Sequence, residues 1–343
     1  MSRVQVHGVG AVSPAGWGRA ALMAGLRANV PVGTKPLAHP GREQALTVRG
    51  VPPASPRPAF LANPRMRRTS PIAQFALAAA LEALGDDAAQ VATGGLKLGI
   101  VLCVMNGCVN YSRRFYDEAL RDPATASPLV FPETVFNAPS SHIAAVLGTT
   151  AINYTLVGDP AVFGQGLAQA ADWLSAGRVD GCLVIGAEEL DWLTASAFRL
   201  FSRQIVLAEG AGAVYLRAQA APDGAGVELV GVTSPQQYAS AVARRRAIAQ
   251  VAQELVGLGA ADWWMDGVQG AARLDRDELS VGPAAGAQRI SVKHILGEGL
   301  AAATPWQCVA AVETLLETGA GTADVLLAGC NEQAIGVRFR KTA

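Results

Sequence analysis

The sequence predicts an α/β fold built from two copies of one unit of strands and helices. Residues 166–189 and residues 306–332 show the same order of features: an apolar helical period that ends at glycine, a turn with aspartate, and an apolar run ending in glycine and an acid. The apolar strands are continuous rather than alternating, which is typical of strands covered on both faces by helices. We therefore expect sheets enclosed between layers of helices.

A second matched pair precedes these segments. An Ala/Leu-rich helix over residues 71–85 leads to an apolar strand over residues 96–107. In the second half, a similar helix over residues 245–259 leads to a strand over residues 261–270. Each half also opens and closes with a strand; these four strands are residues 4–13, 211–218, 227–234 and 334–341.

The join between the halves is predicted at residues 218–226, a stretch of turn residues with proline and glycine. This divides the chain into an N-terminal half, residues 1–218, and a shorter C-terminal half, residues 226–343. The helices over residues 166–177 and 306–319 are nearly all apolar, and a helix without a polar face must be covered on all sides. We therefore expect the two halves to pack as one body.

The composition argues against nucleic acids and acidic membranes as binding partners. Half of the 343 residues are hydrophobic and 16% are charged, as in a well-buried globular protein. Lys plus Arg and Asp plus Glu number 28 each, so no overall field favours nucleic acid or an acidic membrane. The start of the chain does not read as a signal peptide, and no apolar run reaches the ~20 residues that span a bilayer. We expect a soluble, cytoplasmic protein without membrane insertion.

Cysteine usage and glycine spacing argue against metals and cofactors. The number of cysteines is odd, their spacing is irregular and no CxxC occurs, which disfavours structural zinc and a disulfide framework. The glycines of residues 8–13 lack the third glycine of a dinucleotide fingerprint. We expect no bound metal or cofactor. The five cysteines are Cys103, Cys108, Cys182, Cys308 and Cys330.

Four segments, in the correct order, resemble the β-ketoacyl synthases, a family with the thiolase-like fold. They match the opening strand and turn, the segment that crosses the dimer interface, the hairpin that closes the first half, and the Ser/Thr-Lys segment of the family. The resemblance implies a layered α-β-α-β-α architecture. The segments are VQVHGVGAVSPAGWG (residues 4–18), SPLVFPETVFNAPSSHIAAVLG (127–148), AEGAGAVYL (208–216) and SVKHILGEGLAAA (291–303).

The catalytic residues of that family are replaced here. Its members condense acyl chains with a cysteine at a helix N-terminus, where the dipole favours the thiolate, and with two histidines that assist decarboxylation and stabilise the oxyanion. The cysteine position falls on Pro160, and the histidine positions fall on Gly267 and Glu298; only the lysine remains, as Lys293. Proline offers no nucleophile, glycine has no side chain, and glutamate has the wrong charge. The resemblance therefore implies no catalytic residue at these positions.

The turn around the missing nucleophile makes structural sense. Asp159 is a favourable helix N-cap and Pro160 suits the first helical position, so we predict a helix that begins at Pro160. The family's Phe-Gly-Phe-Gly gate is also missing, because AGCNEQA, residues 328–334, stands in its place without phenylalanine. These losses predict a protein without a proper substrate gate.

Four apolar residues are candidates for an acyl tunnel and a dimer interface. In the resembled family, equivalents of the segment around residues 130–136 reach across the dimer and line or block the acyl tunnel. Ordinary core packing is the alternative for these side chains. The four candidates are Met105, Val130, Phe131 and Phe136.

The leading hypothesis is a non-catalytic subunit of the chain-length-factor type. It would pair with an active ketosynthase in fatty-acid, polyketide or aryl-polyene biosynthesis, with acyl-carrier protein delivering an acyl-phosphopantetheine chain. One alternative is an acyltransferase or condensing enzyme with a relocated site, using Cys103 or Cys108 with help from Lys293, Glu298 or His294. Another is a homodimer that binds an acyl chain or acyl-carrier protein. Because His294 directly follows the lysine, a regular strand would turn it to the opposite face.

Overall fold

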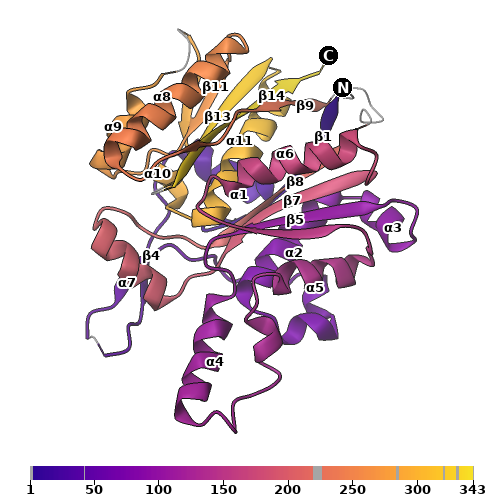
Figure 1. The fold of residues 1–343 in the computed structure, drawn as a ribbon, viewed down its shortest axis with the longest axis vertical. Coiled ribbons are helices and arrows are strands. Elements are labelled where there is room, and N and C mark those ends of the chain that lie inside the picture. Colours follow the sequence, from indigo (N-terminus) through magenta and orange to yellow (C-terminus); the bar gives the residue numbers. More distant parts are fainter. Residues whose placement is uncertain are drawn as a thin grey trace.

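Figure 1 shows the computed structural model, which describes residues 3–41, 43–218, 226–282, 286–319, 321–329 and 332–342. The predicted join at residues 218–226 lies almost wholly outside these residues. Cys330 and Asn331, within the segment predicted to stand in place of the gate, also lie outside them.

The two halves of the chain build the same arrangement of strands. The first half has the strands β1 (Val4–Ser13), β5 (Leu98–Val104), β6 (Asn153–Val157), β7 (Gly181–Glu188) and β8 (Gly210–Arg217). The second has β9 (Val227–Val232), β11 (Trp263–Asp266), β12 (Gln288–Ser291), β13 (Thr322–Ala328) and β14 (Gln333–Lys341). The sheet runs β6-β5-β7-β8-β1 in one half and β12-β11-β13-β14-β9 in the other. Numbered along the chain within each half, both orders are 3-2-4-5-1, as a duplicated unit requires.

The first strands of the halves join these two groups into one sheet. Val4 and Val6 of β1 pair antiparallel with Leu229 and Val227 of β9. At the far ends of the order, β6 and β12 are the edge strands. The remaining short strands are β2 (Gly16–Trp17), β3 (Lys35–Leu37), β4 (Leu46–Val48) and β10 (Gln236–Gln237).

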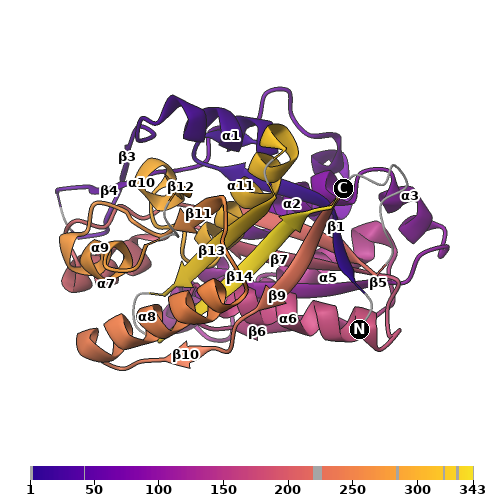
Figure 2. The same cartoon turned by 90° about the horizontal axis from the view of Figure 1, so that it is seen from above.

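The helices form three layers around the strands. Helices α6 (Val162–Ser175) and α11 (Ala303–Thr318) lie between the strands of the two halves, and Figures 1 and 2 show them there. On the outer faces, α2 (Pro71–Leu84) and α5 (Ala138–Leu147) cover the first half, and α8 (Ala241–Gly257) covers the second. The expected α-β-α-β-α layering is thereby confirmed. The other α-helices are α1 (Arg19–Ala28), α3 (Asp87–Ala92), α4 (Val109–Arg121), α7 (Trp192–Phe201), α9 (Ala272–Leu279) and α10 (Val292–Leu296).

The central layer joins both halves into a single core. One hydrophobic cluster contains Phe163 of α6, Val309 of α11, Val101 of the first half and Val325 of the second. Helix α11 is buried on nearly every side, as its apolar composition predicts. Helix α6 departs from that expectation, because Asp172 and Ser175 are exposed.

Small residues allow α11 to approach the first-half strands closely. A Cβ atom on Gly186 of β7 would lie 2.2 Å from the carbonyl oxygen of Ala301, and one on Gly212 of β8 would lie 2.8 Å from Cβ of Pro305. The indole Nε1 of Trp306 lies 3.0 Å from the carbonyl oxygens of both Val12 and Ala211. The start of the second-half helix therefore rests directly on the backbone of the first half.

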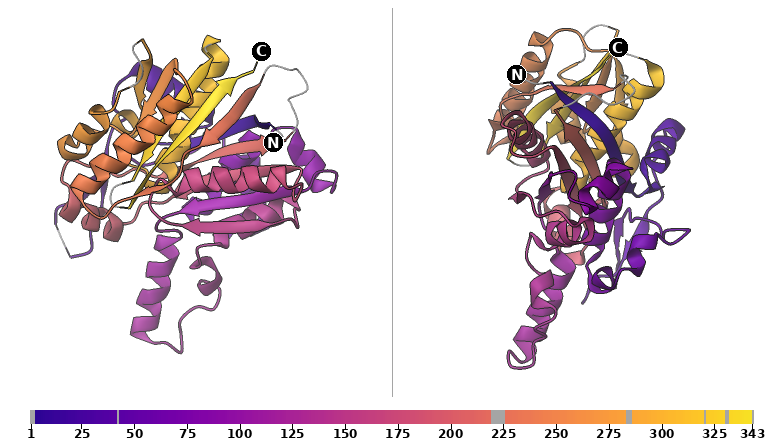
Figure 3. Two further views of the ribbon diagram at one scale, coloured as in Figure 1. Left: turned by 45° about the horizontal axis from the view of Figure 1, so that its top comes forward. Right: turned by 90° about the vertical axis from the view of Figure 1, so that its right-hand side faces the viewer.

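One part of the chain projects from this body. Helix α4 and the segment after it, residues 122–137, extend away from the sheet, as both views in Figure 3 show. Helix α4 has no fully buried residue. We call α4 and residues 122–137 the arm.

Replacing Gly186 by alanine tests the close contact between the halves. The added methyl group would overlap the backbone of Ala301, so we expect the free energy of unfolding to fall by about 1–3 kcal/mol or more, measured by urea denaturation. Gly231→Ala in β9 is the matched control, because nothing lies within 4 Å of a Cβ there; we expect a change within about 0.5 kcal/mol. Equal effects of the two substitutions would contradict the close contact.

Candidate functional site

The turn before α6 holds Pro160 without a nucleophile. Helix α6 begins at Val162 rather than at Pro160, and Ala161 stands at the N-cap position, so the predicted helix start is wrong by two residues. Pro160 is buried, and its carbonyl oxygen accepts a hydrogen bond of 2.8 Å from the Thr304 hydroxyl of α11. The turn is therefore fastened to the central helix of the second half.

Asp159 fastens the same turn to a second element. Its carboxylate accepts a hydrogen bond from the Ala161 N–H at 3.0 Å and from the N–H groups of Glu332 and Gln333 at 3.3 and 3.2 Å. It therefore bridges to β14 and does not cap α6 as predicted. Burial raises the pKa of Asp159, and the N–H donors oppose that shift. A Cβ on Gly329 would lie 1.5 Å from the carboxylate, so only glycine fits there.

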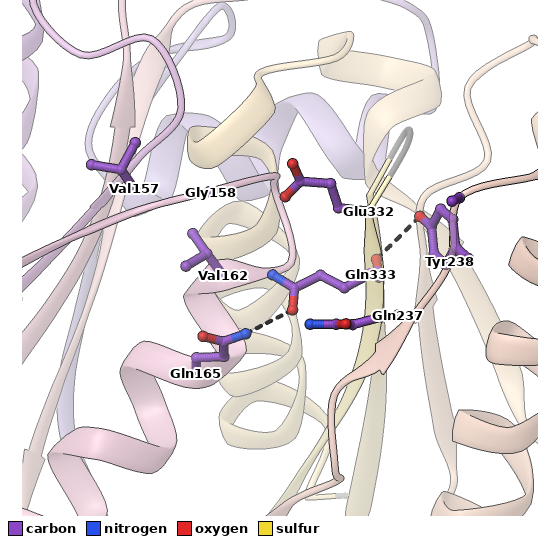
Figure 4. Close-up of a pocket in the computed structure, with 9 residues that line it drawn as sticks. Val157, Gly158, Val162, Gln165, Gln237, Tyr238, Glu332 and Gln333 are labelled. Carbon is purple, nitrogen blue, oxygen red and sulfur yellow. Dashed lines mark hydrogen bonds between the residues drawn. The ribbon is translucent and has the colours of Figure 1, made fainter.

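A pocket of about 540 Å³ opens beside this turn, and Figure 4 shows its lining. Gln165 of α6 donates a hydrogen bond of 2.7 Å to the side-chain oxygen of Gln333, and Gln237 and Glu332 lie nearby. The described lining carries amides, one carboxylate and the Tyr238 phenol, but no cysteine, serine, histidine or lysine.

Lys293 and Glu298 form a buried ion pair. The Lys293 Nζ lies 2.9 Å from Glu298 Oε2, and the two side chains are 1% and 0% exposed. The other oxygen of Glu298 accepts the Leu300 N–H at 2.9 Å. Glu298, which the sequence predicts at the second histidine position, is therefore a structural partner of Lys293.

Gly267 lies against the same network. Its N–H donates to Glu278 Oε2 at 2.6 Å, and a Cβ on Gly267 would lie 3.0 Å from that oxygen and 3.4 Å from Lys293 Cε. Arg244 of α8 pairs with Glu278 at 3.0 Å and with Asp277 at 3.2 Å. Burial raises the pKa of Glu278 to about 7, and the charges of Arg244 and Lys293 act in the opposite direction. These ion pairs fill the space around the first histidine position.

The proposed replacement nucleophiles are core residues. Cys103 is 0% exposed and lies against α6, where a Cβ on Gly166 would meet its sulfur at 2.8 Å. Burial raises the pKa of the Cys103 thiol, and the neighbouring Cys182 adds to the shift. Cys108 is 1% exposed, and burial, assisted by Glu189, raises its pKa to about 12. A buried neutral thiol is a poor nucleophile, so the structure lends neither cysteine a catalytic role.

The histidines also lie apart from the catalytic positions. His294 belongs to helix α10 rather than to the strand assumed from the sequence; its side chain is exposed while that of Lys293 points into the interior. On the other side of the molecule, His142 Nε2 lies 2.9 Å from Glu133, which ties α5 to the arm. Neither histidine replaces the family pair.

The tunnel candidates separate into buried and exposed residues. Val130 is buried, and Met105 is partly buried. Phe131 is 55% exposed and packs on Phe115, with ring centroids 5.3 Å apart, so core packing does not explain it. Phe136 is 45% exposed and covers Gly107, whose added Cβ would lie 2.6 Å from its ring.

Exposed apolar side chains stand on two segments of the first half. They lie on residues 129–136 of the arm and on the edge strand β6, and all are at least 41% exposed. Together they are a candidate interaction surface, because exposed apolar groups are typical of interaction sites. We call it the arm–β6 surface; it comprises Leu129, Phe131, Val135, Phe136, Tyr154 and Val157.

Several residues that organise the site had no recognisable signal in the sequence. Glu278 and Asp277 belong to the charged run of residues 275–278, which reads as a solvated helix face, yet both are buried. Glu188, at the end of β7, accepts the N–H groups of Met105 and Asn106 and thereby positions the tunnel candidate Met105. Burial raises the pKa of Glu188 to about 8.

The comparisons with known proteins decide the family. Residues 1–226 match the family model described as the N-terminal domain of β-ketoacyl synthase. The chain belongs to the β-ketoacyl synthase family. No match is found among curated proteins. Within the described residues, no helix is long and apolar enough to cross a bilayer, and no three His, Cys, Asp or Glu side chains gather as a metal site.

Solved structures with similar folds span the whole chain. The ishigamide ketosynthase/chain length factor gives a TM-score of 0.79 at 19% identity, covering 99% of this chain and 100% of that one. A type II PKS ketosynthase in complex with its acyl-carrier protein gives 0.79 at 16% identity, covering 99% of each chain. A β-ketoacyl synthase from Burkholderia phymatum STM815 gives 0.80 at 15% identity, covering 100% of each. These likenesses confirm the thiolase-like fold.

Breaking the buried ion pair should destabilise this ketosynthase-family chain. Lys293→Met leaves Glu298 buried without its cationic partner, so we expect a loss of about 3–5 kcal/mol in the free energy of unfolding. The double variant Lys293→Met/Glu298→Gln should lose less than the sum of the two single variants. Arg114→Ala, which breaks an exposed pair with Glu118, is the control and should cost less than about 1 kcal/mol. Additive single losses would contradict the pairing.

Glu188 should make stability depend on pH. Its pKa rises from 4.5 to about 8 on folding, so its contribution is fully present below pH 4.5 and is lost as the pH rises through 8. We expect Glu188 to change the free energy of unfolding by at most about 1.4 kcal/mol per pH unit. Glu188→Gln, which mimics the neutral acid, should flatten the dependence of the free energy of unfolding on pH between pH 5 and 8, measured by urea denaturation. If the free energy of unfolding of Glu188→Gln depends on pH as strongly as that of the parent protein, Glu188 is not the source of the pH dependence.

Proposed function

We propose that this chain is a non-catalytic ketosynthase-like subunit of the chain-length-factor type. The proposal is supported by what lies at the predicted catalytic positions: Pro160, at the predicted nucleophile position, is buried, and Lys293 and Glu298, at the predicted positions of the lysine and the second histidine, form a buried ion pair. A side chain at Gly267 would press against Glu278. The centre therefore has neither the nucleophile nor the oxyanion donors that acyl condensation needs.

The partner in this proposal is an active ketosynthase. The arm–β6 surface supports pairing, because it includes exposed aromatic and aliphatic side chains as well as β6, an edge strand among the described residues. Covering it would remove apolar area from water and satisfy the strand edge. A similar structure is named as a ketosynthase/chain length factor, and another holds a ketosynthase with its acyl-carrier protein.

In this proposal, the protein limits the length of the acyl product that the partner ketosynthase builds. Phe131 and Phe136 stand on the exposed side of the arm, so a partner seated there would receive both rings. Acyl-carrier protein would deliver the acyl-phosphopantetheine chain to the partner's catalytic site, and these rings would limit its length. We place the pathway in polyketide biosynthesis, since a similar structure comes from a type II PKS.

The first test is a disruption of the arm–β6 surface. Val157→Arg places a charge on a side chain that is 52% exposed at the β6 edge, so we expect loss of the ketosynthase from the complex isolated through a tag on this chain. Val242→Arg, 65% exposed on α8, is the matched control and should retain it. A ketosynthase that stays bound to Val157→Arg counts against the surface, and a homodimer without any ketosynthase supports the binding-protein alternative.

The second test addresses chain length. Phe131→Ala removes an exposed ring that we place at the boundary of the partner's cavity, so we expect longer products from the reconstituted complex, analysed by mass spectrometry. Tyr116→Ala removes a ring of similar exposure on α4 and should leave product length unchanged. The same product length in Phe131→Ala and the parent chain would remove the tunnel role of this residue.

A further inference from the structure

A groove of about 760 Å³ lies at the end of the sheet opposite the arm–β6 surface. It is bordered by α1, the edge strand β12, α10 and the C-terminal end of α11, which lie together in Figure 2. Its volume is within the range of small-molecule sites, about 300–1,000 Å³. We call it the α1–β12 groove. Neither the buried ion pairs nor the proposed partner surface includes it.

The inner wall of the α1–β12 groove is apolar. Met23 and Leu26 of α1 and Ile295 of α10 line it, and their side chains belong to the central hydrophobic core. Ile290 and Trp263 continue this wall along β12 and β11 and are only partly buried. A ligand that reaches this wall must therefore have an apolar part.

Hydrogen-bond donors with cationic character stand along the rim. Arg27 of α1 and Arg289 of β12 line the groove, and the exposed side chain of His294 lies on the same side. Glu317 is the one carboxylate among the described lining residues. The guanidinium groups present five N–H donors each, in the planar arrangement that suits a carboxylate.

Contacts with other described residues hold the two arginines in place and engage only part of each guanidinium group. Arg27 pairs with Glu317 through Nη2. Arg289 is held from behind: its Nη1 lies 2.8 Å from Asp266, which is fully buried, and its Nη2 donates to the Val281 carbonyl at 3.0 Å. Both guanidinium groups are thus positioned beside an apolar wall, which lowers the entropy lost when an anion binds.

We propose that the α1–β12 groove binds a small amphipathic carboxylate. The carboxylate group lies at Arg27 and Arg289, and the apolar tail lies on Met23, Leu26 and Ile295. The site does not depend on the proposed pairing with a ketosynthase, because it lies at the opposite end of the strand order.

Octanoate and 1-octanol are the probes, because they share a tail and differ in the head group. Isothermal titration of the full chain should show saturable binding of octanoate and at least ~10-fold weaker binding of octanol, since hydrogen bonds to charged groups exceed those to neutral ones. Trp263 lines the groove, so octanoate should also change its fluorescence, and Trp263→Phe should remove that change.

Arg27→Gln is the variant that tests the head-group site. Arg27 has an exposed side chain and pairs with an exposed part of α11, so the variant should fold normally, which circular dichroism checks. We expect octanoate to bind about 10-fold more weakly to it, with octanol unchanged. Arg114→Gln, with a similarly exposed ion pair, should bind octanoate like the parent chain.

Three results would overturn the proposal. These are no saturable octanoate binding, equal affinities for octanoate and octanol, and an octanoate affinity that Arg27→Gln leaves unchanged. None of these measurements uses the ketosynthase partner. A negative result for octanoate binding would therefore not count against the proposed function, and a negative result for partner binding would not count against the octanoate site.

Discussion

The packing around β11 depends on a buried ion pair between a lysine and a glutamate. Lys293 and Glu298 lie 2.9 Å apart with almost no contact with solvent, and each charge would be costly to bury without the other. The neighbouring Glu278 is held by Arg244 and by the Gly267 N–H in the same way. Helices α8, α9 and α10 and strand β11 meet at these charges, so their relative positions depend on keeping the pairs intact.

Contacts between the halves also hold the turn before α6, where the proposal places a lost nucleophile. Asp159 bridges this turn to β14, and the Thr304 hydroxyl donates to the Pro160 carbonyl. These contacts link the turn to the second half of the chain. In the proposal, the function of the chain depends on its outer surface. The arm–β6 surface is the part that would bind the ketosynthase. The α1–β12 groove, at the other edge, offers a second surface that the buried charges do not reach.

Much of the fold could be predicted from the sequence, because continuous apolar strands and helical periods carry a strong local signal. The resemblance to the synthases predicts Pro160, Gly267, Lys293 and Glu298 at the catalytic positions of the family, and that assignment remains a prediction. Side-chain burial was harder to predict. The carboxylates of Asp277 and Glu278 look like part of a solvated helix face, but both are buried in ion pairs with Arg244. Lys293 and His294 lie in helix α10 rather than in a strand, yet Lys293 is buried and His294 is exposed, so the two side chains point to different sides as expected.

The central claim is that this chain carries no acyl group of its own. It is tested most directly by measuring the intact mass of each subunit after the complex, isolated through a tag on this chain, is incubated with an acyl thioester. The account predicts an acyl adduct on the partner ketosynthase and an unchanged mass for this chain. An acyl adduct on this chain, formed as fast as that on the partner, would contradict it.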